Sequence, residues 1–353
     1  MLATHSCWLL NCSTQHAAVN NRKTSNNQKQ RRSATLETEI FRCTLSGKID
    51  DMNSPADSTS DSTSDAHSAH DPQVELDKAI DATAKAFMVA HVSDDDGQLA
   101  QALVLNAGRI AWRLREKGLE QDTKTSISDV VTNADRAAER FIAAVLEGIR
   151  AEDGIVGEEG TRTRSRSGRN WVIDPVDGTY NFASGSDYWC SALALVRGAV
   201  DDPDEIIAAA VHRPAMGYTW FSGSGLRTTR DGKELAPIDD HTLDKSCVGT
   251  YLHPTCMDKE PTQRAWHSVL SNVATLRMLG AGSVDLASVA DGTLHAWMQH
   301  SVPAWDWLPG KALVEGAGGA TAIQFAGGVR WHIAGNQRTV AEIVDILKGT
   351  DHD

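Results

Sequence analysis

The sequence predicts an α/β protein in two unequal halves that meet near residues 235–245. Three observations support this fold class. Apolar residues recur at helical intervals up to about residue 149, and short apolar segments separated by turn residues then predict strands. From about residue 240, helical and strand-like segments alternate. The chain has 353 residues, of which 41% are hydrophobic, so it can bury a sizeable core.

The first 71 residues differ from the rest. Residues 1–36 contain no acid, and residues 54–71 form a Ser, Asp and Thr tract that cannot bury enough apolar surface to fold. We expect a disordered tail, or an extension upstream of a true start at Met52. A targeting segment is less favoured, because the apolar core at residues 7–10 is too short for a secretory signal. The predicted organisation is a disordered extension over 1–71, a first folded half over 72–240 and a second over 241–349.

Three amphipathic helices are predicted at the start of the first half. Residues 72–92 and 94–118 place apolar side chains on one stripe. The second of these has acids at its start and basic residues at its end, as the helix dipole favours. A third helix spans 132–149, with Thr132 or Asn133 as its N-cap.

Short strands follow these helices. The basic stretch at 161–169 is predicted to be a solvated hairpin loop rather than a phosphate-binding patch, because it lacks interleaved aromatic residues and the chain is acidic. The predicted strands cover residues 153–160, 170–175, 191–196, 205–214 and 217–222.

The second half is predicted to alternate helix and strand. We expect a helix over 283–292, a strand over 294–298 and a helix over 307–319 with Pro309 in its opening turn. A last amphipathic helix covers 338–349.

Composition limits the function. The net charge of −13 argues against non-specific binding to nucleic acid. No apolar run approaches the roughly 20 residues that span a bilayer. The six cysteines form no CxxC pair, which suits a reducing cytoplasm.

Two acids follow an apolar strand, Asp174 and Asp177. Close carboxylates repel, and one would hold a proton unless a cation lies between them. Hard oxygen ligands suit Mg²⁺, which would keep both acids ionised. A lone pair of acids around proline and glycine is usually only a turn.

Three further acidic motifs strengthen the metal interpretation. The first, Glu158 and Glu159, follows the predicted strand before Asp174. The second, Asp306, lies between aromatic residues at the start of a predicted helix, and the third surrounds the start of another helix. Each is weak alone, but the ordered set predicts a metal site. Its members are Glu158 and Glu159; Asp306; and Asp129, Thr132 and Asp135.

Gly178 and Thr179 follow Asp177 directly. If a short helix begins here, their backbone N–H groups point out of its end and favour an anion. Metal ions beside such a helix start predict a site that holds a phosphate and generates a nucleophile from water.

At these residues the chain resembles the inositol monophosphatase family of magnesium-dependent, lithium-sensitive phosphatases. The resemblance runs from about residue 97 to 349, and the pairing of WVIDPVDGT with WD is highly specific. It implies a layered α-β-α-β-α sandwich, usually a homodimer, with two to three Mg²⁺ ions per site. The matching segments are GEEG (157–160), WVIDPVDGTYNF (171–182), RMLGAGSVDLASVADG (277–292) and AWDWLPGKALVEGAGG (304–319).

The resemblance implies the metal ligands residue by residue. Glu158, Asp174 and the backbone carbonyl of Val176 match the ligands of a first Mg²⁺. Asp174, Asp177 and Asp306 match those of a second, and a third, looser ion would lie near Glu158 and Glu159.

It also implies the catalytic residues. Thr179 and Asp135 match the pair that orients and deprotonates the attacking water, with Glu158 also placed among the catalytic residues. The amides of Gly178 and Thr179 match the phosphate site, and Lys124 falls where the family has a lysine near the metals.

Two departures concern the substrate. Gln299 stands where many inositol phosphatases carry a glutamate that binds a substrate hydroxyl, and Gly282 replaces a common alanine beside the substrate. Asp177 completes the predicted substrate contacts. Asp285 is expected to cap its helix or face solvent, and His253 and His295 to be surface or hydrogen-bonded histidines.

The predicted function is therefore a Mg²⁺-dependent phosphomonoesterase of the cytoplasm, acting on myo-inositol 1-phosphate or a similar polyol phosphate. The segment ending in GTYNF is closer to inositol monophosphatases than to histidinol-phosphatases. Histidinol phosphate, fructose 1,6-bisphosphate and 3′-phosphoadenosine nucleotides are alternative substrates. A non-catalytic metal-binding scaffold is the alternative from another class. Neither nucleic acid nor a membrane is an expected partner.

Overall fold

The computed structural model describes residues 71–118, 121–123 and 130–350, without the side chains of 121–123 and 130–131. The chain divides into two units, the first ending at Ala90 and the second beginning at His91. The described part of the first unit is Asp71 and α2 (Pro72–His91) apart from its last residue, and this helix confirms the first predicted one. The predicted disordered extension lies outside the described residues but for Asp71, and the boundary near 235–245 stays a prediction.

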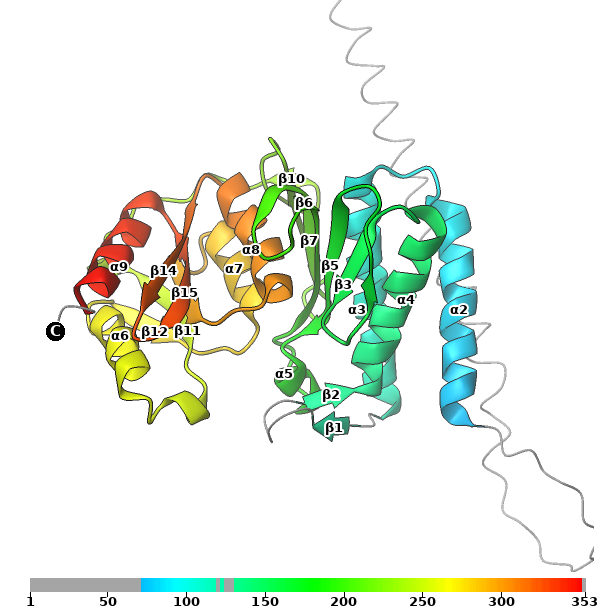
Figure 1. Cartoon of the computed structure of the whole chain (residues 1–353), viewed down its shortest axis with the longest axis horizontal. Helices are drawn as coiled ribbons and strands as arrows, with labels where there is room; N and C mark the ends of the chain where they lie inside the picture. Colours follow the sequence, from blue (N-terminus) through cyan, green and yellow to red (C-terminus); the bar gives the residue numbers. More distant parts are fainter. Residues whose placement is uncertain (1–70, 119–120, 124–129, 351–353) are drawn as a thin grey trace, which may run out of the picture. The chain divides into compact units, whose positions relative to one another are not determined.

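The second unit combines helices with two main sheets, which confirms the predicted α/β class (Figure 1). The N-cap of α4 is Thr132, which is one of the two residues predicted for that position. The α-helices of this unit are α3 (Asp96–Lys117), α4 (Asn133–Ile149), α5 (Thr179–Ala183), α6 (Glu260–Leu270), α7 (Gly282–Ala290), α8 (Ala304–Gly316) and α9 (Gln337–Thr350). Two 3₁₀ helices, η2 (Leu243–Lys245) and η3 (Pro254–Cys256), flank β11.

The larger sheet has eight strands in the order β10-β9-β8-β7-β6-β5-β3-β4. Adjacent strands in this sheet are antiparallel except β3 and β5, which are parallel. The carboxyl ends of β3 and β5 therefore lie at the same edge of the sheet. The strands are β3 (Gly154–Gly157), β4 (Arg162–Thr163), β5 (Arg169–Asp177), β6 (Cys190–Gly198), β7 (Pro203–Arg213), β8 (Tyr218–Gly223), β9 (Thr229–Arg230) and β10 (Lys233–Glu234).

The smaller sheet has five strands in the order β12-β11-β13-β15-β14. β11 runs parallel to β12 and β13, whereas β15 runs antiparallel to β13 and β14. The strands are β11 (Cys247–Tyr251), β12 (Thr275–Arg277), β13 (Ala296–His300), β14 (Ala320–Ala326) and β15 (Val329–Gly335); a separate ladder pairs β1 (Gln121–Thr123) with β2 (Val130–Thr132).

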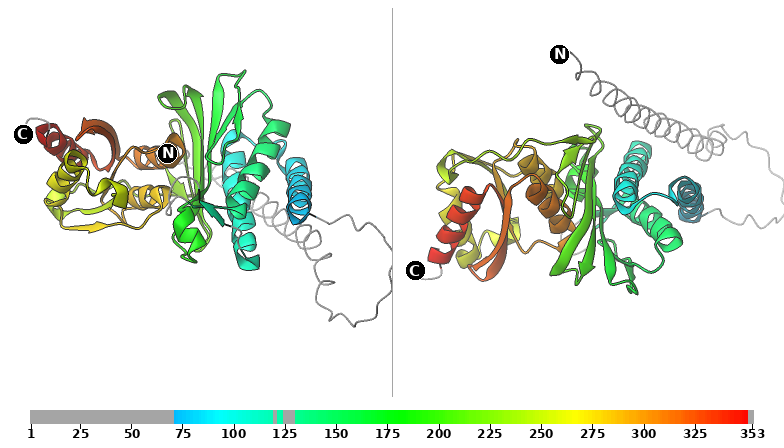
Figure 2. Two further views of the ribbon diagram at one scale, coloured as in Figure 1. Left: turned by 60° about the horizontal axis from the view of Figure 1, so that its bottom comes forward. Right: turned by 90° about the horizontal axis from the view of Figure 1, so that it is seen from above.

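Helices and sheets of the second unit alternate in layers (Figures 1 and 2). α6 and α9 cover the outer face of the five-stranded sheet, and one core cluster joins Val269, Ile343 and Ile333. α7 and α8 lie between the two sheets, where Leu286 and Leu313 pack in the core that includes β5 and β6. α3 and α4 cover the far face of the eight-stranded sheet. The expected α-β-α-β-α order is therefore present.

One predicted helix boundary is wrong. α8 begins at Ala304, so Pro309 lies inside the helix and not in its opening turn. Proline is common in the first turn of a helix, but here burial of Trp307, Leu308 and Pro309 between the two sheets outweighs the backbone hydrogen bond that proline cannot donate. Among the described residues, no helix is both long and apolar enough to cross a membrane.

Candidate active site

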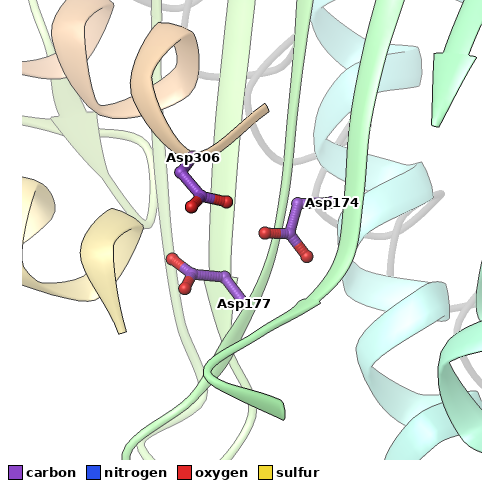
Figure 3. Close-up of side chains that lie close together, drawn as sticks. All are labelled: Asp174, Asp177 and Asp306. Carbon is purple, nitrogen blue, oxygen red and sulfur yellow. The ribbon is translucent and has the colours of Figure 1, made fainter. Parts of the chain in front are cut away.

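A bulge at the end of β5 brings two acids to the same side of the strand. Asp174 and Asp177 are three residues apart, and such positions point to opposite faces in a regular strand. Asp174 pairs with Ala192 and Asp177 with Cys190, so β5 has one residue more than β6 over this interval. The extra residue turns both carboxylates toward the same space (Figure 3).

Asp306 is the third member of this cluster. It lies in the first turn of α8, far along the chain from β5. Carboxylate oxygens of Asp174, Asp177 and Asp306 all lie within 4.8 Å of one another (Figure 3). We call these three residues the aspartate cluster.

The aspartate cluster concentrates negative charge where little water reaches it. The pKa of Asp174 is raised well above its usual value, by burial first and then by the charges of Glu158, Asp177 and Asp306. Burial also raises the pKa of Asp177. Like charges held this close in the folded chain fit a bound cation, and carboxylate oxygens are the ligands that Mg²⁺ prefers.

Asp177 also holds the start of α7. Its carboxylate accepts hydrogen bonds from the backbone N–H of Gly282, at 3.1 Å, and of Ser283. These bonds oppose the effect of burial on the pKa of Asp177. A Cβ atom added to Gly282 would meet only the Trp297 ring, at 3.8 Å, so the glycine leaves open space beside Asp177.

The two glutamates of the GEEG segment follow β3. The backbone N–H of Glu158 donates to the carbonyl of Ile173 at 3.1 Å, which sets it beside Asp174 on the neighbouring strand. The negative charge of Glu158 raises the pKa of Asp174, and that of Glu159 raises the pKa of Asp135. Glu158 is close to the aspartate cluster but is not one of the three residues within 4.8 Å.

Asp135 and Thr179 are in direct contact. The Thr179 hydroxyl lies 3.1 Å from Asp135 Oδ1 and 3.0 Å from the Val176 carbonyl oxygen, and can donate its single hydrogen to either. Asp135 is fully buried and also accepts from the backbone and hydroxyl of Thr132. Burial raises the pKa of Asp135 to about 6.

Gly178 is the N-cap of α5, directly beside the aspartate cluster. Its φ of 92° lies in the left-handed region, and an added Cβ would lie 2.9 Å from the Ala281 Cβ. Only glycine fits this position. The first N–H groups of α5 have no acceptor within the helix, which leaves them available to an anion.

The remaining predicted site residues lie elsewhere or outside the described part of the chain. Gln299 lies on β13, in register with Tyr251 of β11 and His332 of β15. Lys124 and Asp129 lie outside the described residues.

The prediction for Asp285 is wrong. The side chain is only 3% exposed and accepts a hydrogen bond from the Tyr188 hydroxyl at 2.6 Å, and the N-cap of α7 is Ala281. Burial raises the pKa of Asp285 to about 7. Because α7 lies between two sheets, an acid in its first turn points into the protein, which the helix pattern alone does not indicate.

Both histidines are hydrogen-bonded, which agrees with the prediction. His253 Nδ1 lies 2.7 Å from the Thr255 hydroxyl. His295 Nδ1 accepts from the backbone N–H of Cys247 at 2.9 Å.

Sequence reasoning missed Glu139. It is 2% exposed in α4, and its carboxylate accepts from backbone N–H groups of the loop after β3. One sequence feature could have indicated it: Glu139 follows Asp135 by four residues, so both lie on one helix face, which is otherwise apolar.

Known proteins are similar to this chain in sequence and in fold. A sequence model described as the inositol monophosphatase family matches residues 93–348. An inositol-1-monophosphatase from Rhizobium meliloti is 31% identical over 219 residues, which cover 61% of this chain and 80% of that protein. A fructose-1,6-bisphosphatase/inositol-1-monophosphatase from Aquifex aeolicus is 29% identical over 252 residues, covering 70% and 90%. A histidinol-phosphatase from Mycobacterium tuberculosis is 29% identical over 239 residues, covering 65% and 87%.

A solved structure with the same fold is the extragenic suppressor protein suhB from Bartonella henselae. It aligns with a TM-score of 0.64 at 23% identity, over 71% of this chain and 97% of that one. At this identity the likeness concerns the fold alone.

Proposed function

We propose that this chain, which belongs to the inositol monophosphatase family, hydrolyses myo-inositol 1-phosphate or a similar polyol phosphate to the free polyol and inorganic phosphate. The observation that supports this most directly is the aspartate cluster, whose three carboxylates lie within 4.8 Å of one another beside the start of α5. Such a cluster suits metal-assisted hydrolysis of a phosphate ester better than simple binding of a polyol.

The aspartate cluster fits a bound cation, and the resemblance implies two to three Mg²⁺ ions. Glu158, Asp174 and the Val176 carbonyl would hold the first, and Asp174, Asp177 and Asp306 the second. A third would lie near Glu158 and Glu159. When bound, the ions would neutralise the clustered carboxylates and supply Lewis acidity toward the phosphate oxygens.

Two backbone groups would hold the phosphate. The N–H groups of Gly178 and Thr179 stand at the start of α5, where no acceptor within the helix takes them, so they can donate to an anion. Binding there would set the phosphorus atom beside the Thr179 hydroxyl.

Asp135 and Thr179 would prepare the attacking water. A hydroxyl that donates to Asp135 keeps its oxygen lone pairs free to accept a hydrogen bond from water. As the water oxygen attacks phosphorus and the ester bond breaks, the water proton can pass through Thr179 to Asp135, and the polyol alkoxide leaves and takes up a proton from solvent. A pKa of about 6 leaves Asp135 ionised at neutral pH yet able to take a proton.

Substrate choice would depend on Asp177, Gly282 and Gln299. The open space at Gly282 admits a bulkier group than an alanine would. Gln299 can donate or accept a hydrogen bond to a substrate hydroxyl but has no charge. Histidinol phosphate and fructose 1,6-bisphosphate are the rival substrates, because relatives named for both activities match this chain.

A phosphate-release screen of the full-length protein tests the proposal. With Mg²⁺, inositol 1-phosphate should give a higher kcat/KM than histidinol phosphate, fructose 1,6-bisphosphate or phosphoadenosine nucleotides, and EDTA should stop turnover. Millimolar lithium should inhibit. A rival substrate with the highest kcat/KM would replace the polyol assignment, and no release from any substrate would favour the metal-binding scaffold.

We also propose a cytoplasmic homodimer. Tyr180, Leu276 and Met278 are 58%, 38% and 39% exposed. Tyr180 is on α5, whose Asn181 side chain donates to the Leu279 carbonyl at 2.7 Å, so these apolar side chains lie on neighbouring segments. Light scattering should give twice the chain mass, and Leu276→Glu should reduce it; a monomeric wild type would contradict the dimer.

The cytoplasmic assignment is supported by the thiols. Cys190, Cys247 and Cys256 are free cysteines among the described residues, as expected in a reducing compartment.

A further inference from the structure

Glu139 is a buried acid on α4 without a part in the chemistry proposed above. It is 2% exposed, in the middle of a helix face formed by buried apolar residues such as Ala138 and Ile142. Burying a carboxylate is costly unless hydrogen bonds compensate for the lost water. Its hydrogen-bond partners therefore indicate what the side chain is for.

Both oxygens of Glu139 hold the loop that carries the predicted metal-binding glutamates. Oε2 accepts from the backbone N–H of Glu159 at 2.7 Å, and Oε1 accepts from that of Thr161 at 2.8 Å. Bonds from a neutral N–H to a carboxylate are stronger than neutral pairs, and two of them fix both position and orientation. Glu158 and Glu159 thus stand on backbone that Glu139 restrains.

Gly157 shows how closely the carboxylate fits. A Cβ atom added there would lie 2.3 Å from the Glu139 carboxylate, so this glycine makes room for it. The Gly157 N–H donates to the Thr161 carbonyl at 2.8 Å and closes the loop on itself. The loop and the carboxylate therefore have complementary shapes.

α4 also restrains a second part of the site. One turn before Glu139, Asp135 contacts the Thr179 hydroxyl at the start of α5. One helix face therefore contacts both the loop with Glu158 and Glu159 and the residue predicted to orient water.

We propose that Glu139 is a positioning residue, which holds the backbone of Glu158 and Glu159 where their side chains can bind Mg²⁺. This rests on the proposed function only in taking these glutamates as metal ligands. The loop has polar groups that water could satisfy, so without Glu139 it would sample other conformations and bind the metal more weakly. The effect expected is on metal affinity more than on the chemical step.

Three variants of the full-length protein test this. Glu139→Gln keeps the size of the side chain, but an amide can accept only one of the two N–H groups. Gly157→Ala inserts a methyl group where the carboxylate lies. Glu147→Gln is the matched control, because Glu147 is an exposed acid on the same helix.

Two readouts separate positioning from a merely structural role. Calorimetry with Mg²⁺ alone measures metal affinity without substrate, and phosphate release at increasing Mg²⁺ gives the concentration for half-maximal rate and the kcat at saturation. Glu139→Gln and Gly157→Ala should each weaken Mg²⁺ binding by about 10-fold or more. Saturating Mg²⁺ should restore most of kcat, and Glu147→Gln should match wild type.

Specific outcomes overturn the proposal. Wild-type Mg²⁺ affinity in folded Glu139→Gln, or a fall in kcat with no change in Mg²⁺ affinity, would do so. If Glu139→Gln does not fold, Glu139→Asp gives the same test, because it keeps the charge but is too short to reach both N–H groups. A wild type that binds Mg²⁺ yet releases no phosphate would refute the proposed function alone, since calorimetry still tests the positioning.

Discussion

Asp306→Asn should stabilise the metal-free protein while abolishing its activity. Two unit charges 4.8 Å apart repel by about 3.5 kcal/mol at an effective dielectric constant of about 20. Asp306 faces two such charges in the aspartate cluster. Proton uptake relieves part of this repulsion, because the pKa of Asp174 is raised. The variant also loses an acid in the first turn of α8, which contributes about 0.3–1 kcal/mol.

The net expected gain is about 1–3 kcal/mol in EDTA, or roughly 2–4 °C in Tm for each kcal/mol. With Mg²⁺ bound, wild type should become the more stable of the two proteins. Wild type should gain about 2.7 kcal/mol at a hundredfold excess over Kd, whereas Asp306→Asn should gain much less, because a ligand is missing. Thermal melts with EDTA and with Mg²⁺, together with phosphate release, measure both effects. A Tm in EDTA equal to or below that of wild type would refute the view that the cluster is strained by its own charge without metal.

Three further predictions concern neighbouring groups. Asp177→Asn should also abolish phosphate release but gain little stability in EDTA. The relief of charge repulsion is offset because one N–H donor of α7 loses its acceptor, which costs about 1–3 kcal/mol. Turnover like that of wild type would remove Asp177 from the proposed metal ligands. Thr179→Val should lower kcat by about 100- to 10,000-fold with little change in Tm, whereas Thr179→Ser should retain most activity; an active valine variant would contradict the part given to the hydroxyl. Tyr188→Phe should destabilise the protein by about 1–2 kcal/mol at pH 8 and by less at pH 5. The pKa of Asp285 is about 7 in the folded protein and about 4 in the unfolded chain, so the folded protein loses stability as pH rises from about 4 through 7. The Tyr188 hydroxyl limits that loss, because it donates a hydrogen bond to the ionised carboxylate. Equal changes in Tm at both pH values would contradict this role of Tyr188.

The aspartate cluster shows how far sequence reasoning reached. No single acidic motif was sufficient, but the ordered set of acids after strands and at helix starts predicted a metal site, because hard oxygen ligands suit Mg²⁺. The bulge that turns Asp174 and Asp177 to one side was not predicted, since it depends on pairing with β6. Regular alternation along β5 would have separated them.

The errors share one cause. Asp285 was expected to cap its helix or face solvent, and Pro309 to lie in the opening turn of a helix, because helix patterns and turn residues indicate only local preferences. Glu139 was overlooked for the same reason, since an acid in an amphipathic helix is usually solvated. In each case packing against an element distant in sequence decided the environment.

By itself the sequence predicted the α/β class and the oxygen ligands of the proposed metal site, because these follow from residue type and short spacing. The family resemblance implied that Asp174, Asp177 and Asp306 come together, and the tertiary structure decided how they meet, which acids are buried and which backbone segments they restrain. Those properties depend on strand pairing and layer packing between segments more than 100 residues apart, such as β5 and α8, and local patterns contain no information about such distances.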